Sequence, residues 1–201
     1  SRVDFSRHEA LLSTGFTVRY ERMVSSVPLP TLIRMAWGVP ARLRKAAGLL
    51  RARSIFNVNF GLRVRQPIPF SWVYFPEPEF DFHRAGSVSA CVPGMAPRGR
   101  STVYLEFSYR GIRPDKPRLG RRAIASLVKL GWIRSPRDIE TRVDLDLPGA
   151  YVIYDRWREE IVGELTTWLE RQGVAVVGRY GRWEYGTMES ALEQGWGAAK
   201  I

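Results

Sequence analysis

The stretch GVAVVGRYGRWEYGTMESALEQGWGAA, residues 173–199, decides the fold of this chain. It contains an apolar run at residues 174–177, which is typical of a strand buried on both faces, usually in a parallel sheet. Gly178 ends the run, and Thr187 then stands where a helix N-cap is expected. Apolar or small residues follow at helical spacing, namely Met188, Ala191, Leu192, Gly195 and Ala199. The pattern predicts a buried strand, a turn and a closing helix.

A strand, a glycine-bearing turn and a helix N-terminus form a site where free N–H groups and the helix dipole face an anion or a carbonyl edge. Arg179 would add a bidentate contact to a phosphate. Trp183 and Tyr185 would supply flat apolar area against a ring. The alternative is structural, because this arrangement is among the commonest in proteins and the aromatic side chains then serve only for packing. From the residues alone, both interpretations stay open.

The composition limits the class of protein. The chain has 201 residues, 45% of them apolar, which predicts one domain or slightly more. It lacks an apolar run of membrane-spanning length, and SRVDFSRHEA lacks the features of a signal peptide, so a cytoplasmic protein is expected. A single cysteine, Cys91, excludes an internal disulfide, and two histidines argue against a zinc site.

Three explanations fit the formal charge of +11: the chain binds nucleic acid, it binds an anionic cofactor, or its basic surface lost an acidic counterpart when the chain was truncated. Among the 31 basic residues, the lysines are only Lys45, Lys116, Lys129 and Lys200, and the arginines are spread along the chain. Nucleic-acid-binding domains usually concentrate basic residues on one face or in one run. The even distribution therefore argues against a nucleic-acid partner.

The rest of the chain predicts an α+β fold with a mixed, largely antiparallel sheet and flanking helices. Apolar and polar residues alternate as in half-buried strands in the segments 54–64, 70–76 and 101–109. Further strands are expected within residues 16–30, 86–92 and 141–155, and helices within residues 31–37, 40–53 and 119–130. A helix of about four turns is expected after Asp155, because one apolar stripe contains Trp157, Ile161, Leu165, Trp168 and Leu169. Asp155 stands where its N-cap is expected, and Gly173 where its C-cap is expected.

Candidate side chains for a site also occur in the predicted strands. Arg84 lies in a long connection rich in Pro, Gly and Ser, and is either a site arginine or a solvated loop residue. His83 should not share a site with Arg84, because neighbours in an extended strand face opposite sides. Trp72 and Tyr74 face one side of their strand and either line a pocket or belong to the core. Glu106 lies in an apolar strand and needs a partner, for which an arginine across the sheet is expected.

The string GRYGRWEYGTMESALEQG resembles the C-terminal flavin motif of the amine oxidase, protoporphyrinogen oxidase and phytoene desaturase group, in the variant of UDP-galactopyranose mutase. Arg179, Tyr185 and Met188 match the motif, whereas Thr187 stands where the mutase has aspartate. The resemblance implies that the turn lies beside the ribityl chain and pyrimidine edge of FAD, and that the arginine and tyrosine approach the substrate's phosphates. The implied cofactor-binding residues are Gly178, Arg179, Tyr185, Gly186, Thr187, Met188 and Glu189.

Two further blocks carry the resemblance. MVSSVPLPTLI is similar to the strand that leads from the FAD domain into the substrate domain, and WVYFPEPEFDFHRAGSVSACVPGMAPRGRSTVYLEFS is similar to a run of the substrate domain. The resemblance implies that Arg84 points toward the flavin, with Trp72, Tyr74 and Trp183 on the substrate side. It also implies a partition into residues 1–27 of the FAD domain, 28–154 of the substrate domain, and 155–201 returning to the FAD domain.

No GxGxxG motif occurs in the chain, although complete enzymes of this group open with a strand, that motif and a helix. We therefore expect an inactive, colourless fragment that lacks the N-terminal FAD-binding half. Its uncovered sheet edges favour dimerisation or strand exchange.

The leading hypothesis is a fragment of an FAD-dependent oxidoreductase that acts on a small-molecule substrate. The flavin supplies the chemistry in this class, and the sequence identifies no catalytic residue. One alternative is a mutase-like isomerase acting on a nucleotide sugar. Another is a basic nucleic-acid-binding module, which would lose affinity steeply with salt.

Overall fold

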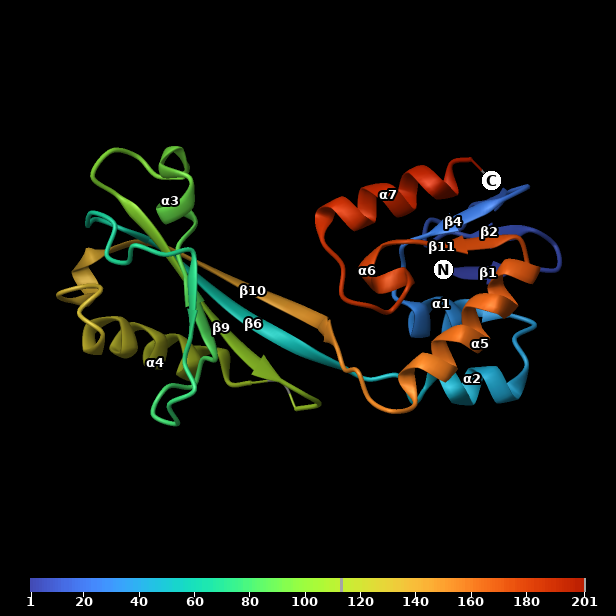
Figure 1. Ribbon diagram of the computed structural model, residues 1–201, viewed down its shortest axis with the longest axis horizontal. Coiled ribbons are helices and arrows are strands. Elements are labelled where there is room, and N and C mark those ends of the chain that lie inside the picture. Colours follow the sequence, from blue (N-terminus) through green and yellow to red (C-terminus); the bar gives the residue numbers. More distant parts are fainter. Residues whose placement is uncertain (113, 201) are drawn as a thin grey trace. The chain divides into compact units, whose positions relative to one another are not determined.

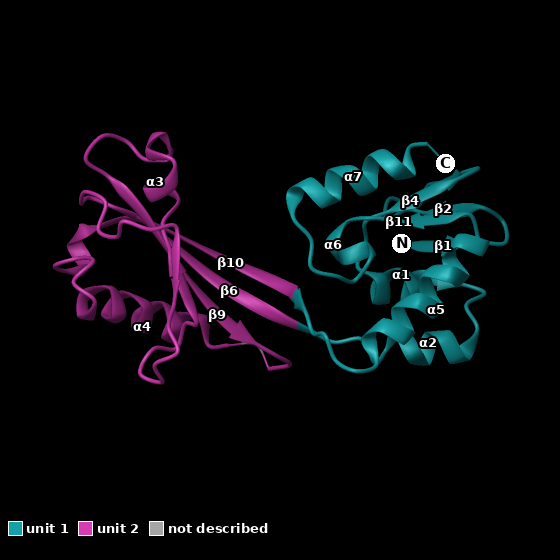
Figure 2. Cartoon of the chain, viewed as in Figure 1, with its two compact units in different colours: residues 1–52, 151–201 teal, residues 53–150 magenta. Residues whose placement is uncertain are grey.

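The computed structural model describes residues 1–112 and 114–200 and divides into two compact units (Figure 1). Unit 1 comprises Ser1–Ala52 and Tyr151–Ile201, and unit 2 comprises Arg53–Ala150 (Figure 2). Each unit contains its own cluster of buried apolar side chains. The segment 28–52, which the resemblance groups with the substrate domain, packs within unit 1.

Unit 2 is built on a five-stranded sheet in the order β10-β6-β9-β8-β7. Its strands are β6 (Ala52–Leu62), β7 (Trp72–Tyr74), β8 (Arg84–Gly86), β9 (Ser101–Tyr109) and β10 (Ile139–Val152). The pairs β6–β9, β9–β8 and β8–β7 are antiparallel. This arrangement confirms the expected α+β class with a largely antiparallel sheet.

The alternation of side chains explains the two faces of this sheet. The buried face contains alternate residues of the two longest paired strands, namely Phe56, Val58, Phe60 and Leu62 of β6 and Val103, Leu105 and Phe107 of β9. Helix α4 (Lys116–Lys129) contributes Ala123 and Leu127 to the same core. Asp115 caps this helix by accepting a hydrogen bond from the Arg118 amide at 3.0 Å. The opposite face includes the polar residues Asn57, Asn59 and Glu106.

The expected strand at residues 86–92 is wrong, because β8 ends at Gly86 and the short helix α3 (Val88–Cys91) follows. Ser87 explains the change, since its hydroxyl accepts a hydrogen bond from the Ala90 amide at 3.2 Å and so caps α3. Two short 3₁₀ helices, η1 (Pro93–Met95) and η2 (Pro136–Asp138), complete this unit's elements.

Unit 1 contains two small sheets. The strands β1 (Arg2–Asp4), β2 (Glu9–Leu11), β3 (Thr17–Arg19) and β5 (Ala36–Trp37) form a four-stranded sheet in the order β3-β2-β1-β5. The strands β4 (Met23–Ser25) and β11 (Val174–Val176) form a two-stranded parallel sheet. The helices are α1 (Leu29–Met35), α2 (Ala41–Ala47), α5 (Arg158–Arg171), α6 (Gly178–Gly181) and α7 (Met188–Ala198).

Helix α5 provides one side of the core of unit 1. Its residues Ile161, Leu165 and Leu169 are buried in the same cluster as Leu32 of α1 and Val174 of β11. The predicted helix is thus confirmed, but its N-cap is Trp157 rather than Asp155. The Asp155 carboxylate lies just before the helix and accepts a hydrogen bond from the Trp157 amide at 3.2 Å. Gly173 follows the helix with a φ of 73°, which is the left-handed conformation that glycine adopts most easily.

The chain passes from unit 1 to unit 2 after Ala52 and returns at Tyr151, and the residues flanking these two points are hydrogen-bonded to each other within unit 1. The Ile153 amide donates to the Arg51 carbonyl oxygen at 2.9 Å, and the Arg51 guanidinium donates to the Asp155 carboxylate at 2.8 Å. This pairing with Arg51 lowers the pKa of Asp155 below its usual value. The expected helix at residues 40–53 is shorter than predicted because α2 ends at Ala47 and β6 has begun by Ala52.

Candidate functional site

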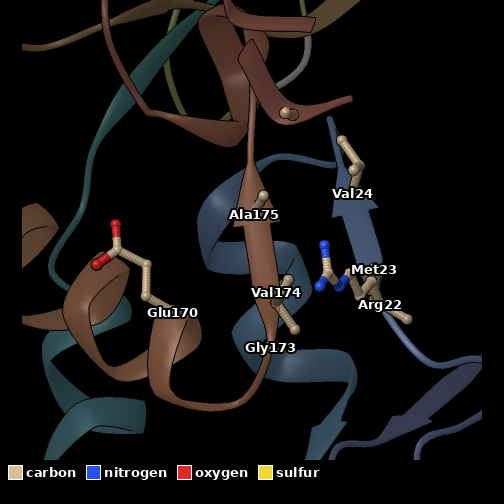
Figure 3. A pocket seen from close by; sticks show the side chains of 8 residues that line it. Arg22, Met23, Val24, Glu170, Gly173, Val174 and Ala175 are labelled. Atoms are coloured by element: carbon tan, nitrogen blue, oxygen red, sulfur yellow. The ribbon is translucent and has the colours of Figure 1, made fainter. Parts of the chain in front are cut away.

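Strand β11 is present where the sequence predicts it, and it is parallel to its neighbour. Val174 lies opposite Met23 and Val176 opposite Ser25 of β4. Val174 is buried, whereas Ala175 and Val176 are only half-buried, so burial on both faces is incomplete. Figure 3 shows the two strands side by side, with the end of α5 on the far side of β11 from β4.

The turn after β11 depends on two glycines. Gly178 has a φ of 73° and donates its amide hydrogen to Oε1 of Gln194 on α7 at 2.7 Å. A Cβ atom at Gly181 would lie 2.7 Å from the carbonyl oxygen of Ser25, so only glycine fits there without a shift. Residues 178–181 form the short helix α6, which the sequence pattern did not predict.

Helix α7 begins where the sequence places its N-cap. The Thr187 hydroxyl accepts a hydrogen bond from the Ser190 amide at 3.1 Å, and the Ser190 hydroxyl accepts one from the Thr187 amide at 2.9 Å. This capping box fixes the first turn of the helix, which also carries Glu189. Gly186 precedes the cap, and a Cβ atom at this position would lie 3.0 Å from the Ser190 hydroxyl oxygen. Met188 projects into solvent with 87% of its surface exposed.

Arg179 is the most informative side chain of this region. Its guanidinium carbon lies 4.9 Å from the ring centroid of Tyr151 and 5.1 Å from that of Tyr185. Its Nε and Nη2 atoms are buried, and neither has a hydrogen-bond partner within residues 1–112 and 114–200. An unsatisfied buried donor costs about 1–3 kcal/mol, and more when it is charged. The arrangement therefore favours an anion as a partner for Arg179.

The two tyrosines belong to a longer stack that sequence reasoning missed. The Tyr185 ring stacks on Tyr154 with centroids 5.1 Å apart and planes 7° apart, and the Tyr154 hydroxyl accepts from the Tyr185 amide at 2.8 Å. The guanidinium carbon of Arg158 lies 4.4 Å from the ring centroid of Tyr154. We call Tyr151, Arg179, Tyr185, Tyr154 and Arg158 the arginine–tyrosine stack. Only the aromatic character of YVIYD could have indicated it, and that signal is weak.

Trp183 differs from its expected role on the substrate side. Its side chain is 5% exposed and packs in the core of unit 1, so it offers no flat face to a ring. The residue adopts a φ of 51°, and its carbonyl oxygen accepts hydrogen bonds from the Arg158 guanidinium. Trp183 therefore anchors the turn that carries Tyr185.

Two hollows flank β11. One has a volume of about 290 Å³ and lies over β4 and β11, with Met23, Val174 and Ala175 in its lining (Figure 3). The other, of about 600 Å³, runs along β11 between α5 and α7, and we call it the β11 groove. Its lining includes Val162, Gly163, Thr166, Val176, Gln194 and Gly197. The predicted strand and turn are thus accompanied by open concavities.

The predicted substrate-side residues Arg84, Trp72 and Tyr74 all lie in unit 2. Arg84 makes a bidentate ion pair with Glu106, with donor–acceptor distances of 3.0 and 2.7 Å. The two residues lie opposite each other on β8 and β9, and Glu106 is 7% exposed. The expected partner of Glu106 is thereby confirmed.

The expectation that His83 and Arg84 point away from each other is wrong. The Nε2 atom of His83 lies 3.7 Å from the Glu106 carboxylate that also binds Arg84. His83 precedes β8 and donates its amide hydrogen to the Glu106 carbonyl oxygen at 3.0 Å, so the alternation of a regular strand does not apply to it. Burial lowers the pKa of His83 below its usual value, although Glu106 opposes this effect.

Trp72 and Tyr74 project from one side of β7, as predicted, and neither belongs to the core. Their exposed fractions are 55% and 60%. Tyr74 lies opposite Arg84 across the β7–β8 pair, and its ring centroid is 5.9 Å from the Arg84 guanidinium carbon. Trp72 lies opposite Gly86, and a Cβ atom at Gly86 would overlap the Tyr104 side chain. We call Trp72, Tyr74, Arg84, Tyr104 and Glu106 the aromatic face of unit 2.

The described residues contain no group of three or more His, Cys, Asp or Glu side chains suited to hold a metal ion. None of the helices in this part of the chain has the length and apolar character needed to span a membrane.

No family model and no curated protein matches the sequence. Solved structures do match. A reduced UDP-galactopyranose mutase superposes with a TM-score of 0.88 at 22% identity, over 98% of this chain and 44% of that one. A protoporphyrinogen oxidase-like protein of Exiguobacterium sp. 255-15 superposes with a TM-score of 0.68 at 10% identity, over 94% of this chain and 43% of the other. An oxidoreductase from Methanosarcina mazei superposes with a TM-score of 0.58 at 10% identity, over 93% of this chain and 44% of the other.

These similarities show that the chain shares its fold with the corresponding parts of the three structures, and they agree with the resemblance of the tail motif. The identities are too low to carry over an activity. The chain spans less than half the length of each of these three structures.

Proposed function

We propose that this chain forms part of an FAD-dependent oxidoreductase of the amine oxidase and protoporphyrinogen oxidase type. The observation that carries the proposal is the pair of buried, unpartnered nitrogen atoms of Arg179 beside a strand–turn–helix site. An anionic cofactor or substrate would satisfy these donors. The resemblance of the tail and the shared fold support FAD as the cofactor.

The residues of the turn fit the polar edge of a flavin. Residues 178–189 contain a glycine turn and the N-terminus of α7, where the helix dipole and the first-turn amides outside the capping box, those of Met188 and Glu189, favour acceptor atoms. Arg179 would bind a phosphate or a carbonyl edge, and Tyr185 would hold Arg179 in place. When bound, the flavin would supply the redox chemistry, while the protein orients it and its substrate.

The aromatic face of unit 2 is proposed to bind the substrate. Trp72 and Tyr74 offer exposed flat surfaces against which a ring can pack. Glu106 holds Arg84 in place beside Tyr74 through a bidentate ion pair. The proposed substrate is therefore a small molecule that carries a ring.

A second candidate is an isomerase that acts on a nucleotide sugar. The superposition with UDP-galactopyranose mutase favours it, as does the suitability of Arg179 for a pyrophosphate. Thr187 in the position of the motif's aspartate weakens this candidate. Turnover of UDP-galactopyranose without net oxidation would distinguish it from the oxidoreductase.

Binding of inorganic pyrophosphate tests the proposed anion site. We expect the purified chain to bind pyrophosphate in isothermal titration calorimetry, and Arg179→Met to weaken binding by about tenfold or more. Arg182→Met is the matched control, because Arg182 lies in the same turn but is half-exposed and already paired with Glu184. Equal binding by Arg179→Met and the unmodified chain would contradict the proposal.

Flavin binding tests the cofactor separately. We expect this chain alone to purify colourless and without turnover, since a strand–GxGxxG–helix unit is absent from its sequence. A yellow protein with stoichiometric FAD would show that the chain needs no second FAD-binding part. Filter binding of RNA and DNA at low and high salt tests the nucleic-acid alternative, and binding that falls steeply with salt would favour it.

A further inference from the structure

The segment between β8 and β9 in unit 2 is held at its base by buried polar groups. The Ser89 hydroxyl donates to the side-chain oxygen of Gln66 at 2.6 Å and accepts from the Thr102 amide at 2.9 Å. The Ser87 hydroxyl accepts from the side-chain nitrogen of Gln66 at 2.8 Å. Ser87 and Ser89 are both buried. These bonds attach the start of α3 to the segment that follows β6.

The residues beyond this base form a surface loop with a defined backbone (Figure 1). Residues 91–95 and 97–100 are exposed. The Met95 amide donates to the Val92 carbonyl oxygen at 2.9 Å, and the Arg100 amide donates to the Pro97 carbonyl oxygen at 2.9 Å. The loop thus consists of two consecutive turns whose side chains face solvent.

The loop and α3 expose apolar side chains in succession. Val88, Val92 and Met95 are 44%, 52% and 61% exposed. The Val92 amide donates to the Val88 carbonyl oxygen at 2.9 Å, so each of these residues is separated from the next by one turn. An exposed apolar group of this kind typically marks an interaction surface.

Arginines accompany these apolar side chains. Arg98 and Arg100 belong to the loop itself. Arg65 lies in the adjoining segment, between Val64, whose carbonyl oxygen accepts from the Ser101 hydroxyl at 2.9 Å, and Gln66. We call Arg65, Val88, Val92, Met95, Arg98 and Arg100 the apolar–arginine surface.

The apolar–arginine surface has little acidic charge to balance it. Residues 52–76 and 82–105 contain no aspartate or glutamate. Glu140 of β10 pairs with Arg100 at 2.8 Å. Arg65 and Arg98 are exposed, and neither has an ion-pair partner in the part of the chain that the structure describes, residues 1–112 and 114–200. Two arginines next to apolar side chains are therefore available to an anionic partner.

This combination fits the interface of an anionic lipid bilayer. Arginine forms bidentate hydrogen bonds with phosphate groups, and its long stem lies along apolar surface while its charged head stays in a polar layer. Apolar side chains that flank such cations enter the boundary between headgroups and acyl chains. We infer that the apolar–arginine surface binds an anionic membrane surface, with Val92 and Met95 at the acyl boundary and Arg65 and Arg98 on lipid phosphates. The inference does not depend on the Arg179 site, which lies in unit 1.

A nucleic acid fits this surface less well. Single-stranded nucleic acids are bound on aromatic side chains against which the bases stack, and duplexes require many phosphate contacts. Residues 87–100 contain no aromatic residue, and the surface offers only three arginines. Nucleic-acid binding is therefore an outcome that would overturn the inference.

Sedimentation with lipid vesicles tests the inference on the purified chain. One set of vesicles contains equal parts of phosphatidylserine and phosphatidylcholine, and the other contains phosphatidylcholine alone. We expect binding to the first set to exceed binding to the second by about tenfold or more, and to weaken as salt is added. Equal binding to the two sets, or binding to neither, would overturn the inference.

Charge removal tests which surface is used. Arg65→Gln/Arg98→Gln should weaken binding to the phosphatidylserine vesicles by about tenfold or more, because each arginine near such a surface strengthens binding about fivefold. The matched control is Arg118→Gln/Arg121→Gln, which removes the same charge from two exposed positions on α4.

The control lies away from the proposed contact. Helix α4 begins at Lys116, which pairs with Asp146 at 2.9 Å, and Asp146 also accepts from the Tyr109 hydroxyl. Tyr109 ends β9, whereas the loop of the apolar–arginine surface precedes Ser101, the first residue of that strand. Equal weakening by the two double variants would assign binding to net charge and overturn the inference.

A second pair of variants tests the apolar contribution. Met95→Gln should weaken binding about fivefold, because the side chain no longer gains from leaving water. Leu192→Gln changes a residue of α7 that is 75% exposed, and it should leave binding unchanged. The reverse result would place the membrane contact on α7 and overturn the inference.

Cys91 gives a direct readout, because it is the only cysteine of the chain and is exposed in the same loop. A polarity-sensitive fluorophore attached to it should shift its emission to shorter wavelength when phosphatidylserine vesicles are added. The same label on Ala125→Cys, an exposed position on α4, in a Cys91→Ser background should show no shift. Vesicle-bound protein whose Cys91 label remained in water, or salt-dependent binding to DNA without binding to vesicles, would overturn the inference.

Discussion

The five-stranded sheet of unit 2 and the two-stranded sheet of unit 1 differ in how completely they are formed. In unit 2, β9 has antiparallel neighbours on both sides and packs against α4. In unit 1, β4 and β11 come from opposite ends of the sequence and pair only with each other in the described structure. Two antiparallel strands can be joined by a short turn, whereas two parallel strands must come from segments that are farther apart in the sequence. The unit that carries the tail motif is thus the one whose parallel sheet has only two strands among the described residues.

The same contrast applies to the two candidate site arginines. Arg84 in unit 2 has its guanidinium paired with a buried carboxylate, whereas Arg179 in unit 1 has two buried nitrogen atoms without a partner. A satisfied arginine contributes orientation, while an unsatisfied one favours an incoming anion. The two arginines would therefore have different tasks in the proposed enzyme.

Core truncations should have the largest effects and should test whether the two units are independent. Leu165 in unit 1 and Leu127 in unit 2 are both fully buried, in separate clusters. Leu165→Ala and Leu127→Ala should each cost about 2–5 kcal/mol in the free energy of unfolding of their own unit. Hydrogen exchange across both units measures this cost. Equal loss of protection in both units from either substitution would contradict the independence of the two cores.

Removal of the buried Glu106 carboxylate in unit 2 should have the second-largest effect on stability. Glu106→Ala leaves Arg84 in a partly buried site without its ion-pair partner, which should destabilise unit 2 by about 3 kcal/mol. Urea unfolding measures the loss. Glu140→Ala is the matched control, since Glu140 pairs with Arg63 and Arg100 at an exposed site and should cost less than about 1 kcal/mol. Similar costs for the two variants would show that the Arg84–Glu106 pair contributes no more than a surface pair.

Periodicity predicted the long elements well, because their side chains obey a single repeat. Alternation identified β6 and β9, and a repeat of three to four residues identified α5. Short elements were missed where a local hydrogen bond decides the backbone, as Ser87 does for α3. The predicted direction of the His83 side chain was wrong for a related reason. His83 lies just outside β8, so the alternation of a regular strand does not apply to it.

The candidate site was only partly predictable. The tail motif identified Arg179, Tyr185 and the Thr187 cap from local sequence. Tyr151 and Tyr154 were missed because they come from the end of β10 and the segment after it, and stacking across such a separation leaves no periodic signal. The resemblance placed Trp183 on the substrate side, whereas the residues alone also allowed a packing role, and the side chain packs in the core of unit 1.

Loss of the α7 cap should have a smaller, local effect in unit 1. Thr187→Ala removes the acceptor of the Ser190 amide and should destabilise the first turn of α7 by about 1 kcal/mol. Exchange of the amides at the start of α7 measures this change. Thr187→Ser retains the hydroxyl and should preserve protection. If the alanine variant remained as protected as the serine variant, the capping box would not stabilise the helix, and α7 would depend on other contacts.

The smallest expected effect is a pH dependence confined to unit 2. His83 has a lowered pKa in the folded state, chiefly through burial, with Arg84 and Arg53 acting in the same direction and Glu106 against it. Between the folded pKa and the unfolded value near 6.5, the unfolded state binds more protons, so stability falls as the pH falls through this window. Urea unfolding of unit 2 at pH 7.5 and pH 5.5, for the unmodified chain and for His83→Gln, measures this contribution. The glutamine variant should lose less stability on acidification, and an identical loss in both proteins would assign the pH dependence to other groups.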